Sequence, residues 1–274
     1  MVNDYHGLSL DQLELLEKQT LRTIVQALQQ ASAEAKDVFE NTRARSDTEV
    51  IVLAEDLARS SLQAAECFPI RYRFRGFIDY KQTRWASTPF GLIPQVLLVD
   101  AKASTENNRE TLQQSQLPMH AEFRGKNGSV ESLDPGVPLD VDIPSEQGNA
   151  IIAVTSSFFV HFWYEKLKEK SFADEPPYRR LKAIYILAVP HGTLKDRYNP
   201  DPDTTFFGQG KHSPKREEEP RIRIYFSRFK SMCPWRLQEL SFNQDAGIAG
   251  PSKGVWRDLD EHGNETMTPF EWMR

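Results

Sequence analysis

The stretch PQVLLVDAKAS, residues 94–104, places two charged side chains at the end of an apolar run. Side chains alternate across a β-strand, so Asp100 and Lys102, which flank one residue, are expected to project from the same face. A second stretch, RFRGFIDYK at 73–81, carries Asp79 directly after two apolar residues. Two carboxylates and an ammonium that converge at adjacent strand ends suit the binding of a hard divalent cation and the positioning of a water for phosphodiester cleavage.

These residue types match the coordination chemistry of magnesium. Mg²⁺ takes oxygen ligands and keeps several waters, so one or two carboxylates and a substrate phosphate are sufficient. The backbone carbonyl of Ala101 lies between the two side chains and is a further candidate ligand. Lys102 would orient the attacking water or stabilise the charge of the transition state. The structural alternative is a plain strand-end salt bridge between Lys102 and Asp79 or Asp100, because such pairs are common at protein surfaces.

Composition excludes several classes of protein. The chain has 274 residues, of which 39% are hydrophobic and 27% charged, as in folded globular proteins and unlike disordered chains. Apolar runs such as AIYILAV at 183–189 are far shorter than the roughly 20 residues of a membrane helix. The N-terminus, MVNDYHG, lacks the basic and apolar regions of a signal peptide. Cys67 and Cys233 have no metal-binding spacing and are expected to be thiols in a reducing, cytoplasmic compartment.

Charge is distributed unevenly along the chain. The net charge is −5, which argues against indiscriminate nucleic-acid binding. Residues 195–236, however, contain ten lysines and arginines against six acids, so this stretch carries +4 and the rest of the chain −9. Affinity for nucleic acid follows the local field at the binding face, so a DNA-binding role for this stretch stays open.

Periodicity and turn residues predict a single α/β or α+β domain, in which helices flank a central mixed β-sheet. Ser9 and Gln12 form a capping-box pattern at the start of the first helix. In the second helix, Glu55 and Asp56 are expected to be solvated, and a supporting role beside the metal is the alternative. The expected elements are helices at 9–40, 49–66 and 104–116, strands at 71–80, 95–103, 181–189 and 221–230, a turn-rich stretch at 82–91, a loop or irregular hairpin at 125–149, a segment at 150–169 that begins extended and ends helical, and a long loop at 190–220.

We divide this domain by expected role into N-terminal helices at 9–66, a catalytic core at 71–189, a DNA-reading loop and strand at 190–230 and a tail at 231–274. In the strand RIRIYFSRFK at 221–230, Arg221, Arg223 and Tyr225 alternate with apolar residues. Arginines on one strand face beside a basic loop suit the readout of guanine O6 and N7 in the major groove. The alternative is a solvated face that is balanced by the acids at 217–219. The tryptophans of the tail, Trp235, Trp256 and Trp272, are expected to pack or to form subunit contacts.

The arrangement Asp79 … Asp100-Ala101-Lys102 resembles the active site of the PD-(D/E)XK nuclease superfamily, although Ile78 and not proline precedes Asp79. Within that superfamily the chain is similar to the SfiI-type type II restriction endonucleases from about Asp4 to the C-terminus. The stretches that carry this resemblance are LRTIVQALQQ, VIVLAED, GFIDYK, PQVLLVDAKAST, RYNPDPDT, GKHSP and CPWRLQEL. It is weaker at 125–150 and at 241–255.

The resemblance implies a Mg²⁺-dependent homotetramer in the bacterial cytoplasm that binds two copies of the interrupted palindrome GGCCNNNNNGGCC in double-stranded DNA. Such an enzyme cuts within the spacer and leaves 5′-phosphates and 3′-overhanging ends. Carried over to this chain, Asp79 and Asp100 are metal ligands and Lys102 is the catalytic lysine. The DNA contacts expected from the basic region and from the residues after the catalytic strand are Arg109, Lys211, Lys215, Arg216, Arg221 and Arg223.

Two other functions remain open at this point. The first is a repair or structure-specific nuclease of the same superfamily. The second is a non-catalytic DNA-binding or assembly protein in which the acids and the lysine have a structural role. The second alternative predicts Mg²⁺-independent binding and no nicks in any substrate, whereas the first predicts cleavage without discrete fragments.

Overall fold

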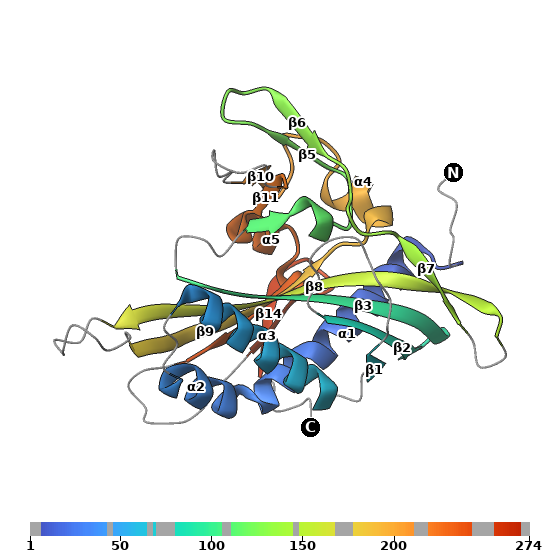
Figure 1. The fold of residues 1–274 in the computed structure, drawn as a ribbon. Helices are drawn as coiled ribbons and strands as arrows, with labels where there is room; N and C mark the ends of the chain where they lie inside the picture. The colour runs from blue at the N-terminus through green and yellow to red at the C-terminus, as the bar shows by residue number, and fades with distance from the viewer. Residues whose placement is uncertain are drawn as a thin grey trace.

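A mixed β-sheet with β3 (Gly91–Ser104) in its interior organises the protein (Figure 1). Six of its seven strands follow the order β1–β2–β3–β8–β9–β12, and β7 pairs with β8. The other strands are β1 (Phe68–Pro69), β2 (Tyr80–Thr88), β7 (Asp140–Pro144), β8 (Ala150–Leu167), β9 (Tyr178–Val189) and β12 (Leu237–Ser241). The computed structural model describes residues 7–42, 46–64, 68–69, 80–105, 111–144, 148–167, 178–210, 219–242 and 255–269.

Both edges of β3 are paired with other strands. β3 runs antiparallel to β2, with Tyr80 opposite Val99, and parallel to β8, with Lys102 opposite His161. The remaining neighbours in the large sheet are antiparallel. The predicted mixed sheet is therefore confirmed, and the strand expected at 95–103 is confirmed and longer than expected.

Three helices cover one face of this sheet (Figure 1). They are α1 (Leu10–Gln30), α2 (Ser32–Asn41) and α3 (Asp47–Ala64). The capping box predicted at the start of α1 is present, because the Ser9 hydroxyl accepts from the Gln12 backbone and the Gln12 side chain accepts from the Ser9 backbone. The helix expected at 9–40 is divided at Ala31, and the helix expected at 49–66 is confirmed as α3. Among the described residues, no helix is long and apolar enough to span a membrane.

A smaller three-stranded sheet and a β-hairpin lie on the opposite side of the large sheet (Figure 1). The small sheet has the order β10–β11–β4, and the hairpin is formed by β5 and β6. The strands of the small sheet are β4 (Thr111–Gln113), β10 (Phe207–Gln209) and β11 (Arg221–Ile224). The hairpin strands are β5 (Ala121–Arg124) and β6 (Val130–Leu133), and a second hairpin is formed by β13 (Val255–Leu259) and β14 (Glu265–Pro269). The short helical elements are η2 (Gln114–Gln116), η3 (Gly192–Leu194), α4 (Lys195–Tyr198), α5 (Phe226–Met232) and η4 (Pro234–Arg236). The irregular hairpin predicted within 125–149 is thus confirmed in part by β5 and β6.

Several local predictions were wrong because strand pairing overrides local turn and helix signals. The stretch at 82–91 is mostly β2, and the turn is limited to the residues around Phe90. In the described part of the helix expected at 104–116, residues 111–113 form β4, which pairs with β11 and buries Leu112, and only the short 3-10 helix η2 at 114–116 is helical. The segment at 150–169 stays extended to Leu167 because its second half pairs with β9. The strand expected at 71–80 lies outside the described residues except for Tyr80, which begins β2.

The strand expected at 221–230 also ends early. β11 stops at Ile224, and the chain continues as α5, in which Phe229 is buried. The long loop expected at 190–220 contains η3, α4 and β10 in its described part. Trp235 and Trp256 are buried, as predicted, and Cys233 is a buried thiol. Trp272 and Cys67 lie outside the described residues.

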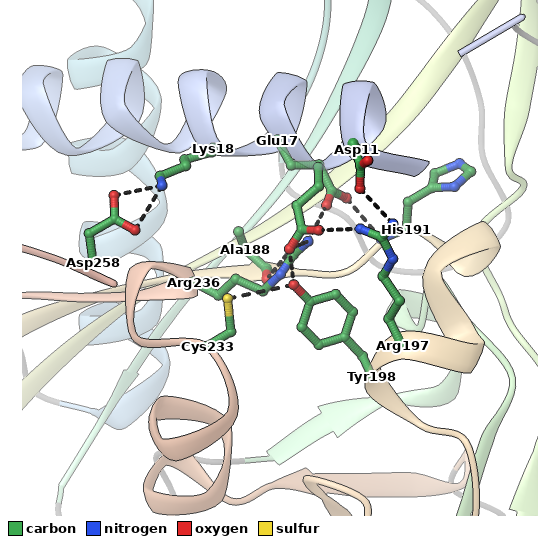
Figure 2. Close-up of polar contacts among 11 residues, drawn as sticks. Asp11, Glu17, Lys18, Ala188, His191, Arg197, Tyr198, Cys233, Arg236 and Asp258 are labelled. Carbon is green, nitrogen blue, oxygen red and sulfur yellow. Dashed lines mark hydrogen bonds and ion pairs between the residues drawn. The ribbon is translucent and has the colours of Figure 1, made fainter. Parts of the chain in front are cut away.

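A buried ion pair joins α1 to the chain just before β12 (Figure 2). Arg236 Nη2 lies 2.8 Å from Glu17 Oε2, and neither side chain is more than 1% exposed. The His191 backbone N–H donates to Glu17 Oε1 at 2.8 Å, while the Arg236 guanidinium lies 4.4 Å from the centre of the Tyr198 ring. Burial raises the pKa of Glu17, and Arg236 and the His191 N–H counteract that rise. Each charge therefore depends on the other for compensation.

Replacing Glu17 with leucine is expected to lower the free energy of unfolding by about 3–5 kcal/mol, because it removes the nearer carboxylate from the buried Arg236 charge and leaves only Glu14, at 3.7 Å, to compensate it. Urea unfolding at one protein concentration measures this loss. The matched control is Glu265→Leu, which removes the partly exposed pair with Arg257 at 2.8 Å and should cost about 0–1 kcal/mol. Equal losses in the two variants would contradict a special role for the buried pair.

Candidate active site

The end of β3 brings Asp100 and Lys102 together on one face of the sheet, as the alternation of side chains predicted. Lys102 Nζ lies 2.8 Å from Asp100 Oδ2. Asp100 is only 5% exposed, whereas the Lys102 side chain is 26% exposed. The salt bridge considered as a structural alternative is therefore present, but it is a partly buried pair and not a surface pair. Burial alone does not distinguish a structural pair from a functional one, so the groups around the two charges must decide.

A third side chain, Gln116, contacts both charges. Its Nε2 donates to Asp100 Oδ1 at 2.7 Å, and its Oε1 accepts from Lys102 Nζ at 3.2 Å. Gln116 is 2% exposed and lies at the end of η2, directly after β4. The sequence pattern did not indicate this residue, because 104–116 was expected to be a helix. The signal that would have helped is the buried Leu112 between polar residues, which is typical of a short strand.

The three side chains line a pocket of about 320 Å³. Glu55 and Ile51 of α3 line it from one side, and Arg221 of β11 lines it as well. Asp56 is exposed, as expected, whereas Glu55 is half-buried and borders the same pocket as Asp100, which keeps the alternative of a supporting role beside the metal open. Arg221, which was predicted to read bases, is placed beside the catalytic candidates. The pocket therefore combines two carboxylates, two cations and two amides, those of Gln113 and Gln116.

Asp79 lies outside the described residues, but the strand register bears on its neighbour. Tyr80, the residue after Asp79, pairs with Val99, the residue before Asp100. The adjacent-strand arrangement on which the prediction of convergence rests is therefore present from Tyr80 onward. Ala101 lines the pocket between Asp100 and Lys102. The role of Ala101 and of Asp79 as metal ligands stays a prediction.

The predicted DNA contacts are only partly described. Arg223 lies two residues after Arg221 on β11, and its guanidinium is 5.8 Å from the centre of the Tyr225 ring. The strand alternates as predicted, because Ile222 and Ile224 are buried while the arginines are half-buried. The other predicted contacts lie outside the described residues, namely Arg109, Lys211, Lys215 and Arg216. Glu219, counted among the acids that could balance the arginines, instead accepts from the Ser115 backbone and hydroxyl.

The donor set of the pocket fits a hard divalent cation. Within the described residues no three histidine, cysteine or acidic side chains form a metal cluster. Asp100, Glu55 and the Ala101 segment nevertheless supply oxygen atoms, and the pocket lining includes no sulfur atom and no imidazole. Such a set suits Mg²⁺ and does not suit zinc, which prefers cysteine and histidine.

A family model described as type II restriction enzyme SfiI matches residues 34–240. The chain belongs to this family. The type II restriction enzyme SfiI of Streptomyces fimbriatus is 57% identical to the chain over 271 residues, which cover 98% of each protein. The resemblance stated from the sequence motifs is therefore confirmed.

Solved structures agree with the family. The crystal structure of tetrameric restriction endonuclease SfiI bound to cognate DNA matches with a TM-score of 0.87 and covers 98% of both chains. That of restriction endonuclease BglI bound to its DNA recognition sequence has a TM-score of 0.63 at 15% identity, and it covers 84% of this chain and 90% of BglI. The second match supports the fold alone, and it confirms a restriction-endonuclease core of helices around a mixed sheet.

Proposed function

We propose that this member of the SfiI family is a Mg²⁺-dependent endonuclease that cleaves double-stranded DNA at the interrupted palindrome GGCCNNNNNGGCC. The proposed cuts lie in the spacer and leave 5′-phosphates and 3′-overhanging ends. The observation that carries the proposal is the Asp100–Lys102 pair at 2.8 Å in a pocket, in a chain 57% identical to SfiI over nearly its whole length. A purely structural pair would not need an open pocket that contains a second carboxylate and an arginine.

In this proposal Asp79, Asp100 and the Ala101 carbonyl would hold the metal, and Glu55, which lines the same pocket, is a further candidate oxygen ligand. Bound Mg²⁺ lowers the pKa of a coordinated water and neutralises charge that develops on the phosphate. Of the Asp100–Lys102 pair, Lys102 is the more exposed side chain, so its ammonium faces the pocket that the substrate would occupy. Its ammonium orients the attacking water or stabilises the transition state.

Assembly and recognition follow from the same family. The solved SfiI is tetrameric and bound to cognate DNA, and we propose the same homotetramer, bridging two DNA sites, for this chain. A two-fold pair of subunits would read one GGCC half each, and the spacer would be crossed without base contacts. We assign guanine contacts to the basic residues at 211–223, and Arg109 to phosphate or the minor groove. A cytoplasmic location, where the cell's DNA lies, is part of the same proposal.

Digestion of a long mapped DNA tests the function directly. With Mg²⁺ we expect discrete fragments whose sequenced ends fall in the spacer of the proposed palindrome, and with EDTA we expect no cleavage because the metal is removed. Smears or junction-dependent cuts would favour a repair or structure-specific nuclease. A protein that binds DNA without metal and never nicks it would favour the non-catalytic alternative.

Asp100→Ala is expected to abolish cleavage, because it removes a metal ligand and leaves Lys102 without its partner. Specific DNA binding in Ca²⁺, measured by gel shift, should stay within a few-fold of the wild-type protein. The control is Asp258→Ala, a distant carboxylate that pairs with Lys18 at 2.6 Å. Normal cutting by the Asp100 variant would refute the assigned metal site.

Arg221→Ala and Arg223→Ala test the readout. If an arginine contacts guanine through both O6 and N7, its loss should cost about 1–3 kcal/mol of specific binding and should relax specificity. Because Arg221 lines the catalytic pocket, we expect its removal also to weaken binding to unrelated DNA, as a phosphate contact would. Arg223 should affect the cognate site more strongly. Titration of cognate and random duplexes in Ca²⁺ measures how much affinity each variant loses for each DNA. If the loss on cognate DNA relative to the loss on random DNA is the same for both variants, the two arginines do not differ in role as proposed.

A further inference from the structure

The side-chain amide of Gln116 contacts both charges of the Asp100–Lys102 pair and the backbone of its own turn. Gln116 Oε1 accepts from Lys102 Nζ at 3.2 Å and from the Gln113 backbone N–H at 3.0 Å. With the oxygen engaged by two donors, Nε2 must face Asp100 Oδ1, 2.7 Å away. The amide is neutral, so it contacts both charges of the pair without neutralising either of them.

The same turn is held from the other side by the chain that leads into β11. The Glu219 carboxylate accepts from the Ser115 backbone N–H at 2.5 Å and from the Ser115 hydroxyl at 3.0 Å. One residue earlier, the Gln114 backbone N–H donates to the Pro220 carbonyl at 2.9 Å. Pro220 directly precedes Arg221, so these contacts connect the turn to the arginine-bearing strand.

A close approach of backbone to backbone fixes the third side of the turn. A Cβ atom added at Gly136 would lie 2.3 Å from Ser115 Cα and 2.5 Å from the Gln114 carbonyl oxygen. The Gly136 N–H also donates to the Leu117 carbonyl at 2.9 Å. The turn at 114–116 therefore has little room to move, and the Gln116 amide is delivered to the charged pair in one position.

We propose that Gln116 is a positioning residue for Asp100 and Lys102, and that the Glu219–Ser115 contact makes this position depend on the strand that carries Arg221 and Arg223. The proposal rests on the proposed nuclease function. The amide contacts both Asp100 Oδ1 and the ammonium of Lys102, so it fixes the two charges relative to each other, with Lys102 Nζ 2.8 Å from Asp100 Oδ2. DNA bound to the arginines would stabilise β11, and the Glu219 contact would carry that order to the charged pair.

Two variants of Gln116 test the contacts of its amide. Gln116→Glu keeps an oxygen toward Lys102 but loses the donor to Asp100, and Gln116→Met loses both. We expect each to lower the single-turnover cleavage rate on saturating cognate DNA by about 10–100-fold, the usual range for residues that orient metal ligands. Both should also raise the Mg²⁺ concentration needed for half the maximal rate. Calorimetric titration of the DNA complex with Ca²⁺ should show weaker metal binding, without any need for cleavage.

The matched control is Gln238→Met. Gln238 is another fully buried glutamine, and its amide makes hydrogen bonds of 2.8 and 3.0 Å to the Trp235 and Arg257 carbonyls and of 3.0 Å to the Arg257 N–H. This variant should lose stability and keep its cleavage rate and Mg²⁺ dependence. If Gln116→Met also keeps the wild-type cleavage rate and Mg²⁺ dependence, the positioning role is overturned. It is likewise overturned if Gln238→Met changes the rate and the Mg²⁺ dependence as much as Gln116→Met does. Should Gln116→Met fail to fold, the near-isosteric Gln116→Glu decides the question.

The link to β11 is tested by a double-mutant cycle with Glu219→Ala. If Glu219 acts through the turn, the rate of the Glu219→Ala, Gln116→Met double variant should equal that of the slower single variant. Losses that multiply would overturn the link. The outcome is separable from the proposed function. Cleavage by Asp100→Ala refutes the nuclease site, whereas an inactive Asp100 variant beside a normal Gln116→Met refutes only this inference.

Discussion

The pairing of β3 on both of its edges is the constraint on which the candidate site depends. β2 holds β3 from one side up to Val99, and β8 holds it from the other side as far as Ser104. Asp100 and Lys102 thus stand where the described pairing with β2 ends and the pairing with β8 continues. The pairing with β8 gives the two charges a rigid base, and the pocket beside them leaves Lys102 accessible.

Two ion pairs among the described residues, Glu17–Arg236 and Asp100–Lys102, have different surroundings. Glu17 and Arg236 are enclosed by Tyr198, Trp235 and the His191 backbone, so the pair joins α1 to the C-terminal part of the sheet. Asp100 and Lys102 open instead into a pocket. A buried pair that only stabilises the fold is best sealed from water, whereas a pair that acts on a substrate must remain reachable.

The small sheet places the arginines proposed for recognition beside the residues proposed for catalysis. β11 pairs with β4, and β4 leads directly into the turn with Gln116. One short strand and one turn therefore connect the arginines of β11 to the charged pair of β3. This arrangement explains why Arg221, predicted from the sequence as a base-reading residue, lines the pocket of Asp100 and Lys102.

The sequence by itself determined the elements whose signals are local. The Ser9 capping box, the apolar run before Asp100 and the spacing of Asp100 and Lys102 needed no distant partner to be interpreted, and the specific motifs were sufficient to predict the family. Tertiary structure decided the rest. Residues 82–88 and 111–113 became strands because neighbouring strands offered unpaired backbone groups. Glu55 and Gln116 line the pocket because of where a helix and a turn pack, which no sequence period indicates. Contacts between segments far apart in the chain depend on the packing of the whole molecule, so local pattern cannot predict them.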